Sequence, residues 1–290
     1  MAPRIAVLWD VDGTLSNSEP TAMRIAVEML VDKFALTTLD RKDLGLAART
    51  TANRAALVKD LIEAWAGRHF THMIDECELL PERGPLDDVA RGNLAEECFV
   101  ATVEALNGAE LNTGIEETLW HGAGKGYVQT VVTSSHEDRV EPCITAVKHF
   151  FRNPRGDYRL YSAATIQAGP SRFNGQLSRA RTDLQNKPAP DIYVLALETE
   201  GLDPKATMAI EDSMSGVKAA LGAGVKVIGY VGGEHIVDKA GRKAEMEALG
   251  VVHIVEDGRR LKSAIDAVAI EIAAGTPSVD RSGALAPLSI

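Results

Sequence analysis

The sequence LWDVDGT, residues 8–14, joins an apolar run to a pair of aspartates, Asp10 and Asp12. The run covers residues 4–9 and is unbroken, which is typical of a strand buried on both faces of a parallel sheet. Open α/β sheets bind ligands at the carboxyl ends of their strands. The two aspartates are therefore the first residues of a predicted functional site.

Further strands and helices alternate along the rest of the chain. Strand-like runs are predicted at residues 125–132, 206–210, 225–231 and 253–255. Helical patterns are predicted between them at residues 137–149, 188–200, 214–222 and 238–248. This alternation predicts a doubly wound, Rossmann-like parallel sheet of the α/β class.

The domain organisation is predicted from where this alternation is interrupted. Residues 18–106 have helical periodicity and no convincing strand, so we expect a helical cap domain there. The α/β core domain would then comprise residues 1–17 and 107–275. Residues 150–186 are rich in loop signals, with a further strand near 159–166, and residues 276–290 are predicted to be a flexible tail.

Composition limits the classes of partner. The net charge of -10 argues against a nucleic acid, which needs a basic footprint. The first apolar run is too short to cross a membrane. Three cysteines without ligand-like spacing favour a reduced, cytoplasmic protein, and the sequence leaves a monomer and a homodimer both open.

Paired carboxylates at a strand end can divide two chemical roles. Asp10 can attack phosphorus beside a divalent cation, and Asp12 can protonate the leaving oxygen and later activate water. Gly13 allows a sharp turn, and the hydroxyl of Thr14 can contact the substrate. Capping or a tight turn is the alternative role for such a pair.

Other polar residues follow the later predicted strands. Hydroxyl and amide donors for a phosphoryl group are expected at Thr133, Ser134 and Ser135. Lys187 offers a positive charge that can stabilise negative charge developing on the phosphoryl group. The alternative interpretation is a solvated lysine in a loop.

Glu211 and Asp212 supply hard oxygen ligands suited to Mg2+. Ser213 is expected to cap the helix that follows them.

Four motifs in order make the chain recognisable. They are D-x-D-G-T at 10–14, a threonine at a strand end at 133, K-P-x-P-D at 187–191 and E-D-S-x-x-G at 211–216. This series closely resembles the haloacid dehalogenase-like (HAD) superfamily, in particular its subgroup of β-phosphoglucomutase and small-molecule phosphatases with a helical cap. The resemblance covers about residues 4–275 and is weakest in the cap and in 150–186.

The resemblance implies roles for individual residues. Asp10 would be the phosphorylated nucleophile and Asp12 the acid/base, whose backbone carbonyl also binds Mg2+. Thr133 and Lys187 would hold the phosphoryl group.

The resemblance also implies a metal site and a cap contact. Asp212 would bind the metal, and Glu211 would be a ligand or orient metal-bound water. Arg49 matches the family's cap arginine loosely and would contact a distal phosphate or sugar.

Departures from the family pattern count against some of the activities found in the family. Ala22 stands where the mutases have a histidine, and Asn17 stands where aspartate is common. Asp12 counts against dehalogenation, because the dehalogenases lack an acid/base there. Phosphonate cleavage needs a Schiff-base lysine in the cap, and Lys33, Lys42 and Lys59 do not match that motif.

Three other clusters have ordinary structural interpretations. Residues 122–126 fit a helix end and turn, because they lack the P-loop spacing. His69 and His72 fit a solvated helix face, and residues 136–138 fit the first turn of a helix. The cysteines are expected to be core or surface thiols.

These observations predict a Mg2+-dependent phosphatase acting on a small phosphorylated metabolite, a sugar phosphate, through an aspartyl-phosphate. A phosphomutase with the same core is the nearest alternative. A binding protein without activity on the same fold is the alternative from another class.

Overall fold

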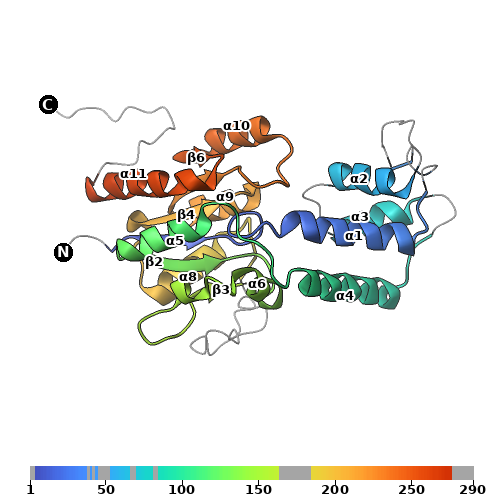
Figure 1. Ribbon diagram of the computed structural model, residues 1–290, viewed down its shortest axis with the longest axis horizontal. Coiled ribbons are helices and arrows are strands. Elements are labelled where there is room, and N and C mark those ends of the chain that lie inside the picture. The colour runs from blue at the N-terminus through green and yellow to red at the C-terminus, as the bar shows by residue number, and fades with distance from the viewer. Residues whose placement is uncertain are drawn as a thin grey trace.

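A computed structural model describes residues 4–37, 40, 43–44, 53–65, 70–80, 84–162 and 184–275. Strands in these ranges form one parallel sheet in the order β3-β2-β1-β4-β5-β6 (Figure 1). The strands are β1 (Ala6–Trp9), β2 (Val128–Val132), β3 (Leu160–Tyr161), β4 (Thr207–Glu211), β5 (Lys226–Tyr230) and β6 (His253–Val255). The predicted doubly wound α/β fold is confirmed, and its first strand lies in the middle of the sheet.

The central strand β1 is buried on both faces. Val7 and Trp9 belong to the apolar cluster on one face, and Ala6 and Leu8 belong to the cluster on the other. Successive side chains of a strand point to opposite faces, so a strand between two cores needs an unbroken apolar run. This packing explains the sequence that precedes Asp10.

Helices cover both faces of the sheet (Figure 1). The cluster that includes Trp9 contains residues of α5 (Ile115–Gly124), α6 (Glu137–Ile144) and α11 (Leu261–Ala273). The cluster that includes Leu8 contains residues of α8 (Asp191–Glu200), α9 (Met214–Gly222) and α10 (Lys239–Leu249). Short 3-10 turns lie at Lys148–Phe151, Pro204–Ala206 and Gly258–Arg260.

Four further helices, which we call the helical group, follow β1 and pack together beside the sheet (Figure 1). They are α1 (Glu19–Lys33), α2 (Arg54–Ala64), α3 (Phe70–Glu78) and α4 (Asp88–Ala105). The group has an apolar core of its own, in which Leu30, Leu61 and Met73 are almost fully buried. Asn53 and Asp87 cap α2 and α4 by accepting backbone hydrogen bonds, which satisfies otherwise unpaired amide groups.

Several predicted boundaries differ from the structure. The helix expected over 137–149 ends at Ile144, and a separate 3-10 turn begins at Lys148. Pro142 inside the helix has no amide hydrogen to donate. The strand expected near 159–166 is β3, which has only two residues. The turn expected at 122–126 is confirmed, because α5 ends there and Gly126 has a φ of +74°.

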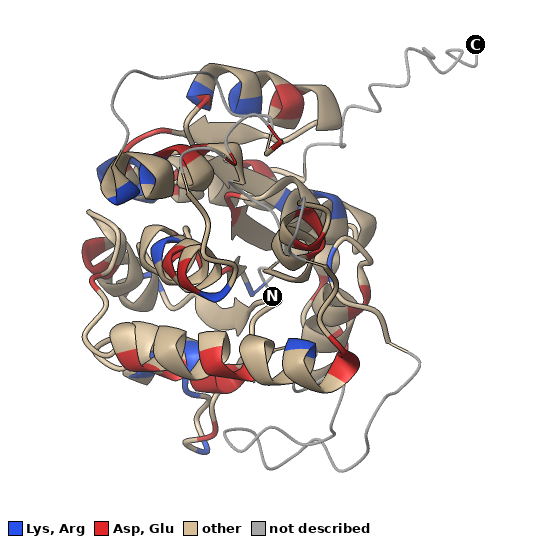
Figure 2. Cartoon of the chain, turned by 90° about the vertical axis from the view of Figure 1, so that its right-hand side faces the viewer, with Lys and Arg blue, Asp and Glu red and all other residues tan. Residues whose placement is uncertain are grey.

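Some predictions fall where the structure gives no description. Arg49, His69, residues 163–183 and the tail at 276–290 lie outside the described residues. Within the described part of the chain, no helix is long and apolar enough to cross a membrane. Figure 2 shows basic and acidic residues interspersed over the helices, so local groups determine the potential at any site.

Candidate active site

A buried lysine joins two carboxylates at the carboxyl edge of the sheet. The Nζ atom of Lys187 donates to Asp10 Oδ1 at 2.8 Å and to Glu211 Oε1 at 2.7 Å. Its third hydrogen bond goes to the carbonyl of Val132 at 2.9 Å. An ammonium group has three donors, so these contacts use all of them. The lysine side chain is only 2% exposed, which excludes a role as a solvated loop residue.

The sheet register brings these groups together. Trp9 of β1 pairs with Ile210 of β4, so the next residues along the two strands, Asp10 and Glu211, are also neighbours. The backbone N–H of Asp10 continues this pairing by donating to the carbonyl of Ile210 at 3.2 Å. Lys187 reaches the same edge from the segment before α8.

Asp212 completes a cluster of three carboxylates. Oxygen atoms of Asp10, Glu211 and Asp212 all lie within 4.8 Å of one another, and all three residues are buried. Hard carboxylate oxygens at this spacing fit a divalent cation such as Mg2+. Even with Lys187 and a protonated His235, which lies 2.8 Å from Asp212, three ionised carboxylates keep a net negative charge, so the cluster also fits a cation by charge.

The pKa values of the cluster are raised mainly by burial and further by the neighbouring negative charges. Burial raises the pKa of Asp10 well above its usual range, Glu211 and Asp212 add to the rise, and Lys187 opposes it. Burial likewise raises the pKa of Glu211, again opposed by Lys187. A divalent cation at this place would favour the ionised carboxylates.

Two glycines allow the backbone to approach these carboxylates. Gly13 has a φ of +79°, and a Cβ atom there would lie 2.2 Å from Asp212 Oδ2 and 2.5 Å from His235 Cε1. A Cβ atom on Gly216 would lie 2.0 Å from Glu211 Oε2. Ser213 caps α9, as predicted, by accepting a hydrogen bond from the N–H of Gly216 at 3.1 Å.

Asp12 has different surroundings from Asp10. Its carboxylate accepts hydrogen bonds from Ser18 Oγ at 2.6 Å, from Arg139 Nη2 at 3.1 Å and from the hydroxyl of Ser135. Burial alone would raise the pKa of Asp12, but Arg139, Ser135 and Ser18 together lower it below its usual value. The two aspartates therefore occupy environments that act on their acidity in opposite directions.

The three hydroxyl residues after β2, Thr133, Ser134 and Ser135, differ in burial and in their contacts. Thr133 is almost fully buried, and its Oγ1 accepts a hydrogen bond from the N–H of Ser135 at 3.1 Å. Ser134 is exposed, and its carbonyl accepts from Asn186 at 3.1 Å. Of these residues, only Ser135 directly contacts one of the two aspartates through its side chain in the described structure.

Thr14 makes no hydrogen bond to the carboxylate cluster through its side chain among the described contacts. Its side chain is fully buried, and within the described residues its hydroxyl has no hydrogen-bond partner. Asn112 Nδ2 donates to the carbonyls of Gly13 and Thr14, at 2.9 Å each. Asn112 therefore fixes the turn after the aspartates from the segment that returns to the core.

Several polar neighbours of the site were not anticipated from the sequence. They are Ser18, Asn112, Arg139, Tyr193 and His235. His235 Nε2 lies 2.8 Å from Asp212 Oδ2, and the Tyr193 hydroxyl donates to Glu211 Oε1. Only Arg139 had a local signal. His136 caps α6, which places Arg139 in the first turn of the helix that follows Thr133, Ser134 and Ser135.

Residues considered and set aside in the sequence have ordinary surroundings. Cys77, Cys98 and Cys143 are buried free thiols, and burial raises the pKa of Cys77 to about 12 and of Cys143 to about 11. Thiols with such raised pKa values are poor nucleophiles. His72 lies on α3, in the helical group.

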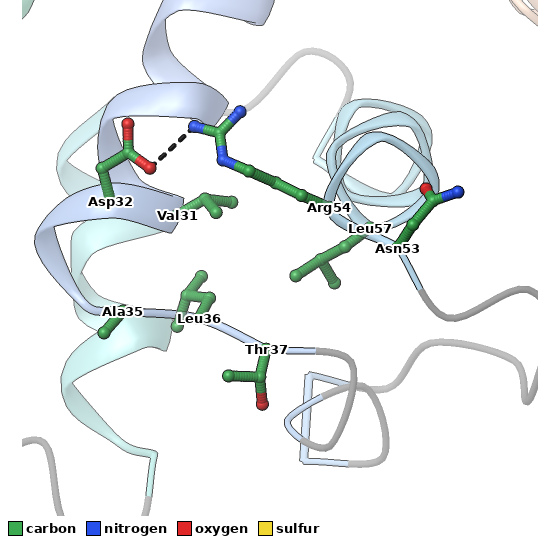
Figure 3. Close-up of a pocket in the computed structure, with 8 residues that line it drawn as sticks. All are labelled: Val31, Asp32, Ala35, Leu36, Thr37, Asn53, Arg54 and Leu57. Carbon is green, nitrogen blue, oxygen red and sulfur yellow. Dashed lines mark hydrogen bonds and ion pairs between the residues drawn. The ribbon is translucent and has the colours of Figure 1, made fainter.

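A cavity of about 520 Å³ lies elsewhere, between the end of α1 and the start of α2 (Figure 3). Arg54 and Asp32 form an ion pair of 2.7 Å beside it. Glu19, near the carboxylates, and Val31, at the cavity, are about 18 Å apart along α1, at 1.5 Å per residue. The cavity is therefore separate from the site of Asp10.

Comparisons with known proteins agree with this geometry. The family model described as haloacid dehalogenase-like hydrolase matches residues 6–224. Protein CbbY of Rhodobacter capsulatus is 26% identical over 227 residues, which are 77% of this chain and 83% of the relative.

Two solved structures show the same fold. A HAD family hydrolase from Deinococcus radiodurans R1, with bound phosphate and sodium, has a TM-score of 0.60 and 20% identity over 93% of this chain and 98% of its own. A mutant of CbbY from Rhodobacter sphaeroides, in complex with xylulose-(1,5)bisphosphate, has a TM-score of 0.50 and 21% identity over 89% and 96%.

Proposed function

The chain belongs to the haloacid dehalogenase-like hydrolase family, and on that premise we propose that it is a Mg2+-dependent phosphatase of a small phosphorylated metabolite. The observation that carries the proposal is the contrast between its two aspartates. Asp10 lies among Lys187, Glu211 and Asp212, whereas Asp12 is held by hydroxyl and guanidinium donors. Carboxyl groups in such different environments are suited to different roles in one reaction.

The first step transfers the phosphoryl group to the enzyme. An oxygen of Asp10 attacks phosphorus, and the ester P–O bond breaks as the aspartyl-phosphate forms. Asp12 must enter this step protonated, although Arg139, Ser135 and Ser18 lower its pKa. It then gives its proton to the leaving oxygen, so the product departs as an alcohol. Lys187, held in place by Glu211, stabilises the negative charge on the transferring group.

The second step releases inorganic phosphate. Asp12, now ionised, removes a proton from water as the water oxygen attacks phosphorus. The bond between phosphorus and the Asp10 oxygen breaks, and both aspartates return to their first state. Ser18, Ser135 and Arg139 stabilise the ionised form of Asp12 that this step requires.

Mg2+ would be held by the carboxylates of Asp10 and Asp212 and the backbone carbonyl of Asp12. It would supply positive charge next to the transferring phosphoryl group. Glu211 already accepts hydrogen bonds from Lys187 and Tyr193, which supports an orienting role beside the metal.

Phosphoryl contacts are assigned to the loops that follow the strands. Thr133, Ser134, Ser135 and the backbone at Gly13 are the proposed donors. Lys187, whose three donors are already used by Asp10, Glu211 and Val132, would contribute its positive charge. Thr14 is not assigned a phosphoryl contact, because no hydrogen bond among the described residues links its hydroxyl to the site.

We propose a sugar phosphate as the substrate class. CbbY from Rhodobacter sphaeroides, which shares the fold, was solved with a sugar bisphosphate. The helical group would act as a cap domain over residues 18–106, between two parts of a core domain at 1–17 and 107–275. Closure of such a cap would exclude water and add substrate contacts, including one from Arg49.

The nucleophile is tested with Asp10→Asn. This variant is expected to lose Mg2+-dependent phosphate release from p-nitrophenyl phosphate, because an amide oxygen is a far weaker nucleophile than a carboxylate. Asp203→Asn is the matched control: Asp203 caps an exposed 3-10 turn, and asparagine caps equally well. Wild-type activity in Asp10→Asn would exclude Asp10 as the nucleophile.

The mutase alternative is tested with glucose 1-phosphate. A phosphatase releases inorganic phosphate from it, whereas a mutase converts it to another sugar phosphate and depends on a bisphosphate. Ala22, in α1, has no group that can transfer a proton, which favours the phosphatase.

A further inference from the structure

An arginine from the core joins the proposed acid/base to the first helix of the helical group. Arg139 lies in α6, and its Nη2 atom is 3.1 Å from Asp12 Oδ1 and 3.1 Å from Glu19 Oε1. Glu19 is the first residue of α1. One guanidinium nitrogen is therefore shared by a residue of the proposed active site and a residue at the entrance to the helical group.

The contacts of Asp12 indicate which of its oxygens can face a substrate. Oδ1 accepts hydrogen bonds from both Ser18 and Arg139, which matches its two acceptor positions. Oδ2 accepts one, from the Ser135 hydroxyl. Among the described contacts, the remaining acceptor position of the carboxylate is therefore on Oδ2.

We propose that Arg139 is a positioning residue, which holds Oδ1 of Asp12 so that Oδ2 is directed at the leaving oxygen of the substrate. This inference rests on the proposed function, because it assumes that Asp12 exchanges a proton with the substrate. Arg139 itself does not touch the reacting atoms. It acts through Asp12 and ties the orientation of that carboxylate to the start of α1.

The surroundings of Arg139 suit this task. Two carboxylates of like charge, Asp12 and Glu19, lie on the same guanidinium nitrogen and would repel each other without it. The arginine side chain is 23% exposed and that of Asp12 is 13% exposed, so water screens the group only in part. Ser18 precedes Glu19 directly and donates to the same oxygen of Asp12, which reinforces the link to α1.

Comparing substrates with different leaving groups distinguishes a loss of Asp12 positioning from a general loss of activity. Expulsion of an alkoxide requires a proton from Asp12, whereas p-nitrophenolate leaves without one. Loss of the orientation of Asp12 should therefore slow the cleavage of an alkyl phosphate and spare the first step with an aryl phosphate.

The experiment is a single-turnover comparison of the two ester classes in the full-length enzyme with Mg2+. For Arg139→Ala we expect alcohol release from glycerol phosphate to fall by about 10- to 100-fold. The burst of p-nitrophenolate from p-nitrophenyl phosphate should stay within about threefold of wild type, since that step needs no acid. Arg139→Lys keeps one charged donor and should recover part of the loss.

Arg159→Ala is the matched control. Arg159 is likewise an arginine of the core paired with a glutamate, Glu200, at 3.0 Å, but none of its described contacts is with Asp12. We expect it to lower stability while leaving the ratio of the two rates unchanged. If Arg139→Ala does not fold, Arg139→Gln, which preserves most of the side chain, carries the same expectation.

Asp12→Asn provides the benchmark that separates the two claims. Selective loss of alkyl phosphate cleavage in Asp12→Asn but not in the Arg139 variants would overturn the role of Arg139 and leave the proposed function intact. Equal slowing of both esters by Arg139→Ala would also overturn it. No leaving-group dependence in Asp12→Asn would overturn the acid role of Asp12, and the inference with it.

Discussion

At the scale of single residues, Lys187 is the buried counter-charge of two carboxylates in the site. Its ammonium group is the only charged partner shown for both Asp10 and Glu211 within the described residues. Removing one member of a buried ion pair leaves the other charges uncompensated. The lysine should therefore matter for folding as well as for turnover.

We expect Lys187→Met to lower the free energy of unfolding by about 3–5 kcal/mol, because two buried carboxylates lose their counter-charge. Turnover should be lost as well. Urea denaturation measures the first effect, with Lys226→Met as the control. Lys226 pairs with Glu271 at the surface, so its loss should cost less than about 1 kcal/mol. Equal stability of the two variants would contradict the role of Lys187 as a buried counter-charge.

The sequence predicted those site residues that lie directly after strands. Asp10 and Glu211 are neighbours because parallel strands end at one edge, and this rule needs no knowledge of packing. Arg139 and His235 were not predicted as site residues because their contacts are distant in sequence. Arg139 meets a residue 127 positions away, and no local pattern records that pairing.

At the scale of elements, the junction between β4 and α9 tolerates little change. Glu211 ends the strand, Ser213 caps the helix and Gly216 lies against the Glu211 carboxylate. A side chain on Gly216 would displace that carboxylate from Lys187. The start of α9 is thus shaped by the site as much as by helix propensity.

We expect Gly216→Ala to abolish turnover and to lower stability, although alanine is the better helix former. Gly92→Ala, inside α4, is the matched control, because a Cβ there meets nothing within 4 Å. That change should stabilise the protein by about 0.5–1 kcal/mol and preserve activity. Thermal unfolding measures the stability of the two variants, and phosphate release measures their activity. If Gly216→Ala were active and more stable than wild type, the present position of the Glu211 carboxylate would not be required for turnover or stability.

Elements with strong apolar runs were predicted well, and those with weaker signals were not. The strands β1, β4 and β5 agree with their predicted ranges within a few residues. Helices α5 and α11 were not predicted individually, although both pack on the sheet face that includes Trp9. The end of α6 was misplaced, because the helix ends at Ile144 and a separate 3-10 turn follows at Lys148–Phe151.

At the scale of the whole molecule, the helical group and the sheet have separate apolar cores. Leu61 belongs to the core of the helical group, and Leu8 and Trp9 belong to the two cores on the sheet. The chain connects the groups after β1 and again after α4. An apolar core in the helical group that is separate from those on the sheet supports the proposed division into a core domain and a cap domain.

This division predicts that the two parts respond separately to a core substitution. Leu61→Ala should destabilise the helical group by about 2–5 kcal/mol, because it removes a fully buried side chain. Hydrogen exchange should then show lost protection in α1–α4 and retained protection in β1 and β4. Uniform loss of protection over the whole chain would contradict the division.

The fold and the hydrolase family were accessible from sequence, because both depend on short motifs at strand ends. The substrate was not, because residues 38–39, 45–52 and 163–183, which include Arg49, lie outside the described structure. Specificity depends on side chains that meet across the two groups, and sequence spacing does not determine such contacts.

The central claim is that Asp10 becomes phosphorylated during turnover. It is tested most directly by mixing enzyme, Mg2+ and substrate, quenching in acid within one turnover, and mapping the phosphoryl group by peptide mass spectrometry. We predict one phosphoryl group on the peptide that contains Asp10, and none in the Asp10→Asn variant. A phosphoryl group on another residue, or turnover with an unmodified enzyme at every quench time, would contradict the claim.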